Sequence, residues 1–274
     1  MITIIVPFYN TEKYLEECLA SIRGQTFSNY ECLMIDDGST DSSRKIAKKY
    51  LDDSRFKLLG DKHIGFPLSK NLGLDNARGD YILFVDSDDY IESNCLEILY
   101  NNLIETNSDI SIARYTQNMN QKNIDNYFKV ETYKDRDSIM SKLLSNTFLW
   151  NKLYKRYIFD DMRFEDVEAL SDTMLNYLLF EKAHKTCYIN IITYRHRVHD
   201  ENMTYRVRNF SSTYWEHRLN VYITMCSYIL KNYPNLNRRI KMLFNCELCF
   251  IKPHLNELIF NEYNNSEIVK SLLN

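Results

Sequence analysis

Three carboxylates lie within four residues at the point where an apolar segment of the chain ends. Residues 81–85 read Tyr-Ile-Leu-Phe-Val and are followed by Asp86, Ser87, Asp88 and Asp89. Adjacent carboxylates repel one another, and this repulsion is costly in a partly dry cleft. A divalent cation relieves it, because hard cations prefer oxygen ligands and keep coordination sites for phosphate oxygens. The residue types therefore indicate a metal and phosphate site, and the plainer alternative is a solvated acidic turn.

Two earlier apolar segments end in the same manner. Residues 30–35 lead into Asp36 and Asp37, and residues 3–6 lead into Pro7-Phe8-Tyr9-Asn10. Each apolar segment has the length of a buried strand, and helical patterns lie between them. Right-handed crossovers bring the carboxyl ends of such strands to one edge of an open α/β sheet, where ligands bind. We therefore expect all three polar clusters at one edge of a sheet.

These segments resemble family 2 glycosyltransferases of the GT-A fold. Along the first 115 residues the resemblance is carried by six short motifs in order: Val6–Asn10, Gln25–Phe27, Asp36–Asp41, Asn71–Gly73, Gly79–Ile82 and Asp86–Asp89. Farther along, Trp150–Arg156 and Arg163-Phe164 are similar to the acceptor-side half of the bacterial members. The resemblance implies an α/β GT-A fold, with a Rossmann-like, mostly parallel sheet flanked by helices. It also implies a UDP-sugar donor and inversion at the anomeric carbon.

The resemblance implies that residues at the strand ends hold the donor nucleotide. Pro7 and Tyr9 would offer a fixed turn and an aromatic surface near the base. A carboxylate of the Asp36 and Asp37 pair would accept the imide N–H of uracil, which cytosine lacks. Asp86 would contact the ribose and the metal shell. The alternative for the Asp36 segment is a capped turn before a helix, with Thr40 or Asp41 as the cap, and both descriptions can hold together.

The metal, Mn²⁺ or Mg²⁺, is expected at the acidic cluster. Asp88 is the predicted direct ligand, with Asp86 in the shell and the diphosphate completing it, so that the ion acts as a Lewis acid on the leaving group. Asp89 could bind the metal, orient a sugar or cap the turn. His199 stands where some relatives supply a histidine near the metal, and its alternative role is structural. Lys70 stands where relatives often carry Arg. It keeps the positive charge but cannot donate the two parallel hydrogen bonds of a guanidinium, and we place it on the donor side.

A general base is expected shortly after Arg163-Phe164. There the family places an acidic pair ending in Asp at the start of a helix, and Asp172 matches that aspartate. Ser171 replaces the Glu that often precedes this aspartate. The base therefore lacks a neighbouring negative charge that would raise its pKa. A carboxylate base contributes roughly 10²–10⁴-fold when correctly placed. The alternative role of Asp172 is to stabilise the helix N-terminus. Other nearby carboxylates are Glu165, Asp166 and Glu168.

Composition narrows the classes of function. The 274 residues carry a net charge of −3, which argues against general nucleic-acid binding. Seven cysteines without framework spacing suggest a reducing compartment, and Cys246-x-x-Cys249 is expected to be a pair of buried thiols. No secretory signal and no stretch of roughly 20 apolar residues is visible, so we expect a cytoplasmic protein, with peripheral membrane attachment left open.

The pattern along the chain predicts a catalytic domain over 1–205 and a helical region over 206–274. The catalytic domain comprises a nucleotide-sugar-binding half, 1–115, and an acceptor half, 116–205. Expected helices cover Thr11 (as N-cap) to Arg23, 42–50, 68–77, 93–106, 136–146, 211–234 and 236–251, and further strands cover 55–59 and 109–115. Residues 116–135 are polar and without a period, so we expect a mobile loop. The C-terminal helices would pack on the catalytic domain or form a homo-oligomer.

Other classes fit less well. A haloacid-dehalogenase-like phosphatase usually has Thr or Val where this chain has Tyr90. A nucleotidyltransferase usually has a Gly-rich loop with Lys or Arg where this chain has Pro7–Asn10. A catalytically degenerate paralogue that binds a partner or glycan stays open because of Ser171. We therefore predict an inverting, metal-dependent transferase that moves a sugar from a UDP-sugar to a hydroxyl of a polysaccharide, lipid-linked or protein-linked glycan, with Asp172 as general base.

Overall fold

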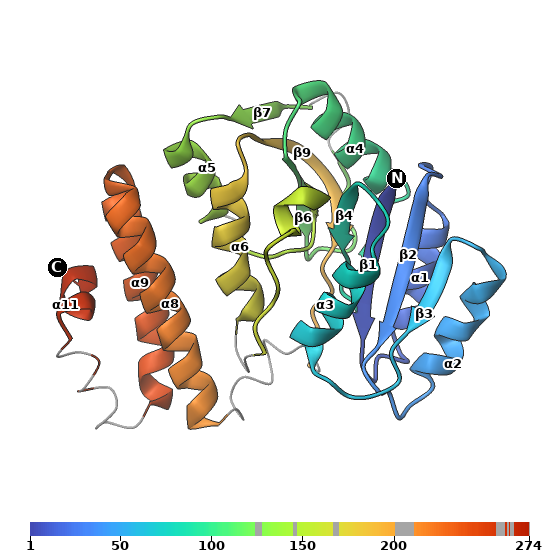
Figure 1. Cartoon of the computed structure of the whole chain (residues 1–274), viewed down its shortest axis with the longest axis horizontal. Helices are drawn as coiled ribbons and strands as arrows, with labels where there is room; N and C mark the ends of the chain where they lie inside the picture. Colours follow the sequence, from blue (N-terminus) through green and yellow to red (C-terminus); the bar gives the residue numbers. More distant parts are fainter. Residues whose placement is uncertain are drawn as a thin grey trace. The chain divides into compact units, whose positions relative to one another are not determined.

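The computed structural model describes residues 1–123, 128–144, 147–166, 170–200, 211–255, 261, 263 and 266–273. The chain divides into two compact units, whose elements are labelled in Figure 1. The first unit comprises Met1–Lys134, Phe148–Asp166 and Lys182–Val198, and the second comprises Asp135–Thr147, Val167–Glu181 and His199–Asn274. The predicted boundary between residues 205 and 206 lies outside the described residues.

The first unit is built on a sheet. In the described part of the chain it has nine strands in the order β3-β2-β1-β4-β8-β6-β9-β5, with β7 paired to β9. Their bounds are β1 Ile2–Phe8, β2 Tyr30–Asp36, β3 Phe56–Leu59, β4 Tyr81–Phe84, β5 Tyr90–Ile91, β6 Ile110–Thr116, β7 Val130–Tyr133, β8 Lys152–Lys155 and β9 Thr186–Arg195. The pairs among β3, β2, β1 and β4 are parallel, and β8 is antiparallel to both of its neighbours. The predicted α/β fold class is confirmed.

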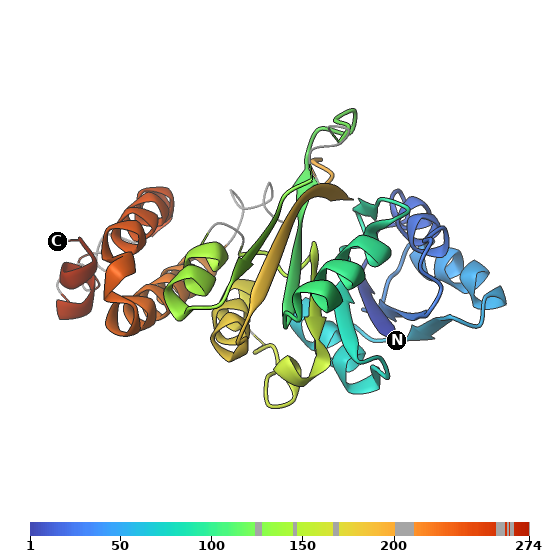
Figure 2. The ribbon, with the colours of Figure 1, turned by 90° about the horizontal axis from the view of Figure 1, so that it is seen from above.

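Helices cover both faces of the parallel half. They are α1 Leu15–Arg23, α2 Ser43–Lys48 and α3 Phe66–Asn76, with the 3₁₀ turns η1 Lys49–Asp52 and η2 Arg156–Phe159. Helix α4 Cys95–Thr106 packs mainly on β6, β8 and β9. Alternate residues of β1, such as Ile4 and Val6, join the core formed with α1 and α4. Ile5 faces α3 at Gly73, where a Cβ would lie 2.5 Å from the Ile5 side chain. In Figures 1 and 2, α3 and α1 accordingly lie on opposite sides of β1. Burial on both faces explains the nearly continuous apolar sequence of β1.

Two predictions about the first unit are wrong. Helix α1 begins at Leu15, with Tyr14 at the N-cap position, and the carbonyl of Thr11 accepts the amides of Tyr14 and Leu15 in the turn that precedes it. Among the described residues, the Thr11 hydroxyl has no hydrogen-bond partner, so this side chain does not cap the helix. The region 116–135, expected to be a mobile loop, contains β7. Strand β7 was missed because its polar residues pair with β9, more than 50 residues farther along the chain.

The second unit is helical in the described residues. Its helices are α5 Arg136–Leu143, α6 Ser171–Lys182 (up to Glu181), α8 Ser212–Asn232, α9 Asn237–Ile251 and α11 Glu267–Leu273, with the 3₁₀ turns η4 Pro234–Leu236 and η5 Lys252–His254. The predicted helices over 211–234 and 236–251 correspond to α8 and α9. The hydroxyl of Tyr233 donates to Glu181 of α6, and Asn235 donates to Asp137 of α5. These bonds connect the two shorter helices to the turn between α8 and α9.

Cys246 and Cys249 are exposed, so the prediction of buried thiols is wrong. The buried residues of α9 are Ile240, Phe244 and Ile251, which define one face of the helix. Both cysteines fall outside that face, although their neighbours in sequence are apolar. Across the described residues, no helix combines the length and apolar character needed to cross a membrane.

Candidate functional site

The carboxyl ends of β2, β1 and β4 lie side by side at one edge of the sheet. Phe8 pairs with Asp36 in the parallel register of β1 and β2, and Ile5 pairs with Phe84 in that of β1 and β4. The register continues past the strand ends, since the amide of Asp37 donates to the carbonyl of Phe8 at 2.9 Å. The segments that begin at Pro7, Asp36 and Asp86 therefore leave the sheet at a common edge.

The turns after β1 and β2 are joined through Asn10. Its backbone has φ 51°, and its side-chain oxygen accepts the amide of Thr40 at 2.8 Å and that of Asp41 at 3.3 Å. The amide of Asn10 in turn donates to the Ser39 hydroxyl at 3.2 Å. Asp41 accepts the amide of Ser43, the first residue of α2, at 2.9 Å. The Asp36–Asp41 segment thus includes the capped turn that we considered alongside a binding role.

Asp36 is committed to interactions inside the protein. Its side chain is 1% exposed, and it accepts the guanidinium of Arg44 at 2.7 Å and the amide of Ser39 at 2.9 Å. Arg44 also donates to the carbonyl of Gly60. Gly60 has φ 75°, and a Cβ there would lie 2.5 Å from the Asp36 carbonyl oxygen, so the close approach requires glycine. Asp36 therefore fixes the backbone around it.

Asp37 lies beside the exposed aromatic surface that we predicted for the base. One of its carboxylate oxygens accepts the amides of Ile64 and Gly65 at 2.7 and 3.1 Å. The other lies 3.0 Å from Nδ1 of His63, whose ring centroid is 4.7 Å from that of Tyr9. Tyr9 is 41% exposed. His63 was missed by sequence reasoning, because it follows β3 in a segment with no motif and reaches Asp37 only through the fold.

The acidic turn after β4 contains two half-buried carboxylates and one that is buried. Asp86 and Asp88 are half-buried, whereas Asp89 is 1% exposed. The Tyr194 hydroxyl donates to one oxygen of Asp89 at 2.8 Å and accepts the amide of Asp86 at 3.1 Å. The amide of Arg197 donates to the other oxygen at 2.7 Å. Burial, together with the negative charges of Asp86 and Asp88, raises the pKa of Asp89 to about 9.

These contacts bear on whether a divalent cation fits the turn. In the part of the chain that the structure describes, no three His, Cys, Asp or Glu side chains are grouped to hold a metal ion by themselves. Burial is the main cause of the raised pKa of Asp89, and the negative charges of Asp86 and Asp88 add to it, so a cation at the turn would relieve part of the repulsion among the three carboxylates. The residues fit a cation that takes part of its coordination shell from a ligand such as a diphosphate.

Lys70 is buried in α3. It is 3% exposed, and its ammonium lies 4.7 Å from the ring centroid of Phe66 and 5.1 Å from that of Phe164. The neighbouring Asn71 side chain donates to the carbonyl of Phe164 at 2.8 Å and accepts its amide at 2.9 Å. The Arg163-Phe164 motif is therefore fastened to α3, with Arg163 paired to Asp75 at 2.8 Å.

Asp172 and His199 belong to the second unit. Asp172 is half-buried in the first turn of α6, where the amide of Met174 donates to the carbonyl of Leu170 at 3.0 Å. Leu170 has φ 54°, an unusual conformation for a residue with a branched side chain. His199 is half-buried and follows the last residue of the first unit. The predicted donor residues Pro7, Tyr9, Asp36, Asp37, Lys70, Asp86 and Asp88 all belong to the first unit.

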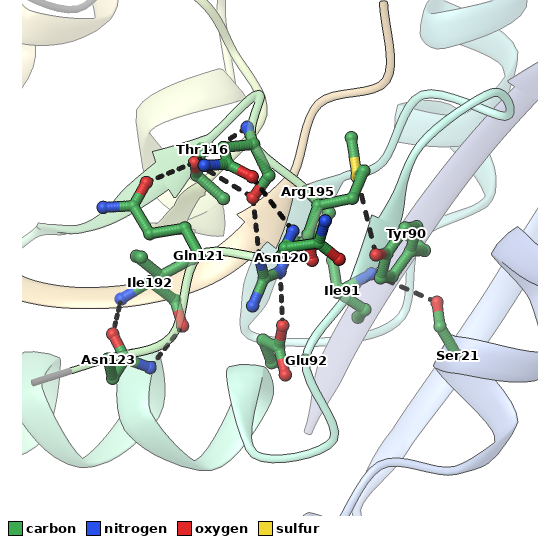
Figure 3. A network of polar contacts seen from close by, with 12 residues as sticks. Ser21, Tyr90, Ile91, Glu92, Thr116, Asn120, Gln121, Asn123, Ile192 and Arg195 are labelled. Carbon is green, nitrogen blue, oxygen red and sulfur yellow. Dashed lines mark hydrogen bonds and ion pairs between the residues drawn. The ribbon is translucent and has the colours of Figure 1, made fainter. Parts of the chain in front are cut away.

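A polar network holds residues 116–123 against β5 and β9, as Figure 3 shows. Arg195 of β9 is 8% exposed and donates to Glu92 at 2.6 Å and to the carbonyls of Asn118 and Met119 at 3.1 and 3.2 Å. The Asn123 side chain donates to the carbonyl of Ile192 and accepts its amide. The segment that we expected to be mobile is thus hydrogen-bonded over its first eight residues, next to the strand that follows the acidic turn.

Comparison with known proteins identifies the sequence relationships of the chain. Residues 3–165 match the model of the family described as glycosyl transferase family 2. The chain is 35% identical over 212 residues to glycosyltransferase GlyA of Streptococcus pneumoniae, covering 72% of this chain and 30% of GlyA. It is 30% identical over 245 residues to the putative glycosyltransferase EpsH of Bacillus subtilis, covering 84% of this chain and 70% of EpsH. The chain therefore spans less than a third of GlyA.

A solved structure shares the fold. Residues 1–349 of Staphylococcus aureus TarS, in complex with UDP-GlcNAc, superpose with a TM-score of 0.75 at 22% sequence identity. The match covers 91% of this chain and 73% of the TarS chain.

Proposed function

Because this chain belongs to glycosyl transferase family 2, we propose that it moves a sugar from a UDP-sugar to a hydroxyl of a glycan acceptor, with inversion at the anomeric carbon. The observation that carries this proposal is the common edge at the ends of β1, β2 and β4. The exposed ring of Tyr9, the Asp37 carboxylate and the acidic turn all lie at this edge, within the first unit.

We assign the uracil to Tyr9 and Asp37. Asp36 is occupied by Arg44 and Ser39, and so it supports the turn from inside. Asp37 is 2% exposed, and one of its oxygens accepts the amides of Ile64 and Gly65, but the other faces His63, whose ring lies against the exposed Tyr9. We propose that this second oxygen accepts the imide N–H that uracil carries. Pro7 fixes the backbone that leads to Tyr9. The UDP-GlcNAc complex of TarS, which shares this fold, supports a uridine donor here as well.

The acidic turn is the proposed place of the diphosphate and its cation. Asp88, with Asp86, would hold Mn²⁺ or Mg²⁺, which when bound neutralises charge on the leaving diphosphate. Asp89 anchors the segment that begins at Arg197, so it keeps the turn in shape. His199, two residues farther along, is proposed to approach the same diphosphate. The burial of Lys70 between two aromatic rings supports a role in positioning Phe164 beside the donor site.

Asp172 is the proposed general base that removes the proton of the acceptor hydroxyl. A carboxylate opposite the leaving group gives a single in-line displacement, and such a displacement inverts the anomeric carbon. The place of Asp172 in the first turn of α6, half-buried, supports this role, because the family places its aspartate at the start of a helix. A polysaccharide, a lipid-linked glycan or a protein-linked glycan would supply the hydroxyl. We also propose a reducing, cytoplasmic setting, because the seven cysteines lack the spacing of a disulfide framework.

A nucleotide-release assay tests the proposal. The purified chain is incubated with Mn²⁺ and UDP-, GDP- or CMP-sugars, without acceptor, and free nucleotide is measured. We expect slow release from one UDP-sugar, abolished by EDTA and by Asp88→Ala. Asp160→Ala is the matched control, since it removes an exposed carboxylate of the same unit that does not belong to the acidic turn. If no sugar nucleotide is hydrolysed, calorimetry with UDP and Mn²⁺ decides, and absence of binding to the folded protein would refute the donor assignment.

A further inference from the structure

We propose that a stack of aromatic rings beside the acidic turn binds the acceptor, with the exposed ring of Phe148 contacting the apolar face of a pyranose. The stack, called the aromatic platform, consists of Tyr115, Phe148, Trp150, Tyr194 and His196, all in the first unit. The inference rests on the proposed function and deepens it, because it names the class of acceptor and a residue that selects it.

The platform has a regular geometry. The rings of Phe148 and Trp150 are stacked with centroids 4.5 Å apart and an interplanar angle of 14°. Trp150 is also stacked on Tyr194 at 4.7 Å and 15°, and on His196 at 5.2 Å and 15°. Tyr115 meets the edges of Trp150 and Phe148 at 86° and 79°. The rings of Phe148, Trp150, Tyr194 and His196 are therefore nearly parallel, and Tyr115 packs against the first two from the side.

Buried side chains hydrogen-bond to the backbone around Phe148 and Trp150. Asn151 is fully buried with φ 58°, and its side chain donates to the carbonyl of Ala113 at 2.9 Å. The buried ammonium of Lys152 donates to the carbonyl of Phe148 and to Asn151. The Tyr154 hydroxyl donates to the carbonyl of Leu149 at 3.3 Å. A buried ammonium costs free energy unless it is hydrogen-bonded, and the bonds of Lys152 offset part of that cost while they hold the carbonyl of Phe148 in place.

The outer ring of the platform is open to solvent. Phe148 is 42% exposed, whereas Trp150 is 4% exposed and Tyr194 is fully buried. The negative face of an aromatic ring attracts polarised C–H groups, and one face of a pyranose presents such groups at the spacing of a ring. A fixed, half-exposed phenyl ring therefore suits a sugar better than it suits a flexible alditol chain.

The platform connects to the site of chemistry through Tyr194. Its ring lies under Trp150, and its hydroxyl bonds to Asp89 and to the amide of Asp86 in the acidic turn. The amide of Gln117 lies 3.1 Å from Nδ1 of His196 and adds a polar group at the rim, suited to sugar hydroxyls. The ring that we assign to the acceptor thus belongs to the same rigid cluster as the turn that we assign to the donor diphosphate.

Fluorescence of Trp150 tests the inference. The chain has two tryptophans, and Trp215→Phe leaves Trp150 as the reporter. The probes are the methyl β-pyranosides of glucose, galactose and N-acetylglucosamine, with ribitol 5-phosphate as a probe without a ring, each titrated with UDP and Mn²⁺ present. We expect at least one pyranoside to change the emission saturably, and Phe148→Ala to weaken its binding about tenfold, equivalent to about 1.4 kcal/mol. Phe148→Tyr should retain binding. If Trp215→Phe fails to fold, saturation-transfer NMR on the otherwise unaltered chain gives the same comparison.

Phe128→Ala is the matched control, since Phe128 is an exposed ring of the same unit, 62% exposed and outside the platform. The inference is overturned if no pyranoside binds while UDP does. It is also overturned if Phe148→Ala weakens binding no more than Phe128→Ala does, or if ribitol 5-phosphate depends on Phe148 equally. UDP affinity should be the same in all these variants. Loss of UDP binding in the parent chain would count against the proposed function instead, and the pyranoside titration would still report on the platform.

Discussion

Replacing Glu31 with Gln should make the folded chain less stable near pH 7 by an amount that shrinks in acid. Glu31 lies on β2 with its side chain 2% exposed. It accepts the Thr3 hydroxyl at 2.9 Å, the Lys57 ammonium at 2.9 Å, and both the amide and the guanidinium of Arg78 at 2.8 and 2.9 Å. These partners come from β1, β3 and the segment before β4, so one carboxylate connects the neighbouring strands at the edge opposite the candidate site.

The size of the effect follows from the pKa of Glu31. Burial raises it, but the hydrogen bonds from Lys57, Arg78 and Thr3 outweigh burial and lower the pKa from 4.5 to about 2. A carboxyl with a lowered folded-state pKa contributes stability above its unfolded pKa and loses it as the pH falls toward the folded one. The difference corresponds to about 3 kcal/mol near pH 7 and to about 1.4 kcal/mol near pH 3.

Urea unfolding at the two pH values measures this contribution. We expect Glu31→Gln to lower the free energy of unfolding by about 3 kcal/mol near pH 7 and by about half of that near pH 3. Glu105→Gln is the control, because it makes the same chemical change at an exposed position on α4. A loss of equal size at both pH values would refute the reasoning, since it would show that the cluster acts through packing and not through the ionised carboxylate.

Three further outcomes are expected. Asp172→Asn should lower the transfer rate roughly 10²–10⁴-fold without changing UDP affinity, as measured by kinetics and calorimetry, and unchanged turnover would remove it as the base. Gly60→Ala should cost about 1–3 kcal/mol in unfolding free energy, because φ is 75° and the new Cβ would meet the carbonyl of Asp36 at 2.5 Å; an unaltered urea midpoint would contradict this. In the native protein a thiol reagent should modify the two exposed cysteines, Cys246 and Cys249, and leave the five buried ones until denaturation; a third fast thiol would show that a buried position opens.

The strands of the donor half could be predicted because their signals are local. Strands β1, β2 and β4 are short apolar segments followed closely by turn residues, Asn10 after β1, Asp37 and Gly38 after β2, and Asp86 after β4, and these residues mark the strand ends whatever the rest of the chain does. Strands β8 and β9 lack such marks, and β7 alternates exposed and half-buried residues of modest apolar character. These three strands are specified by their partners in the sheet, which lie far away in sequence.

The sequence by itself determined the family, the order of the donor motifs and the α/β class, because these follow from residue types at short spacing. Only the tertiary structure decided what each polar side chain contacts. Asp36 and Asp37 are neighbours in sequence, yet one is held by Arg44 and the other lies beside His63 and Tyr9. Asp89 meets Tyr194 across 105 residues. A carboxylate's partners depend on which strands the sheet brings together, and that choice is made by the packing of the whole core.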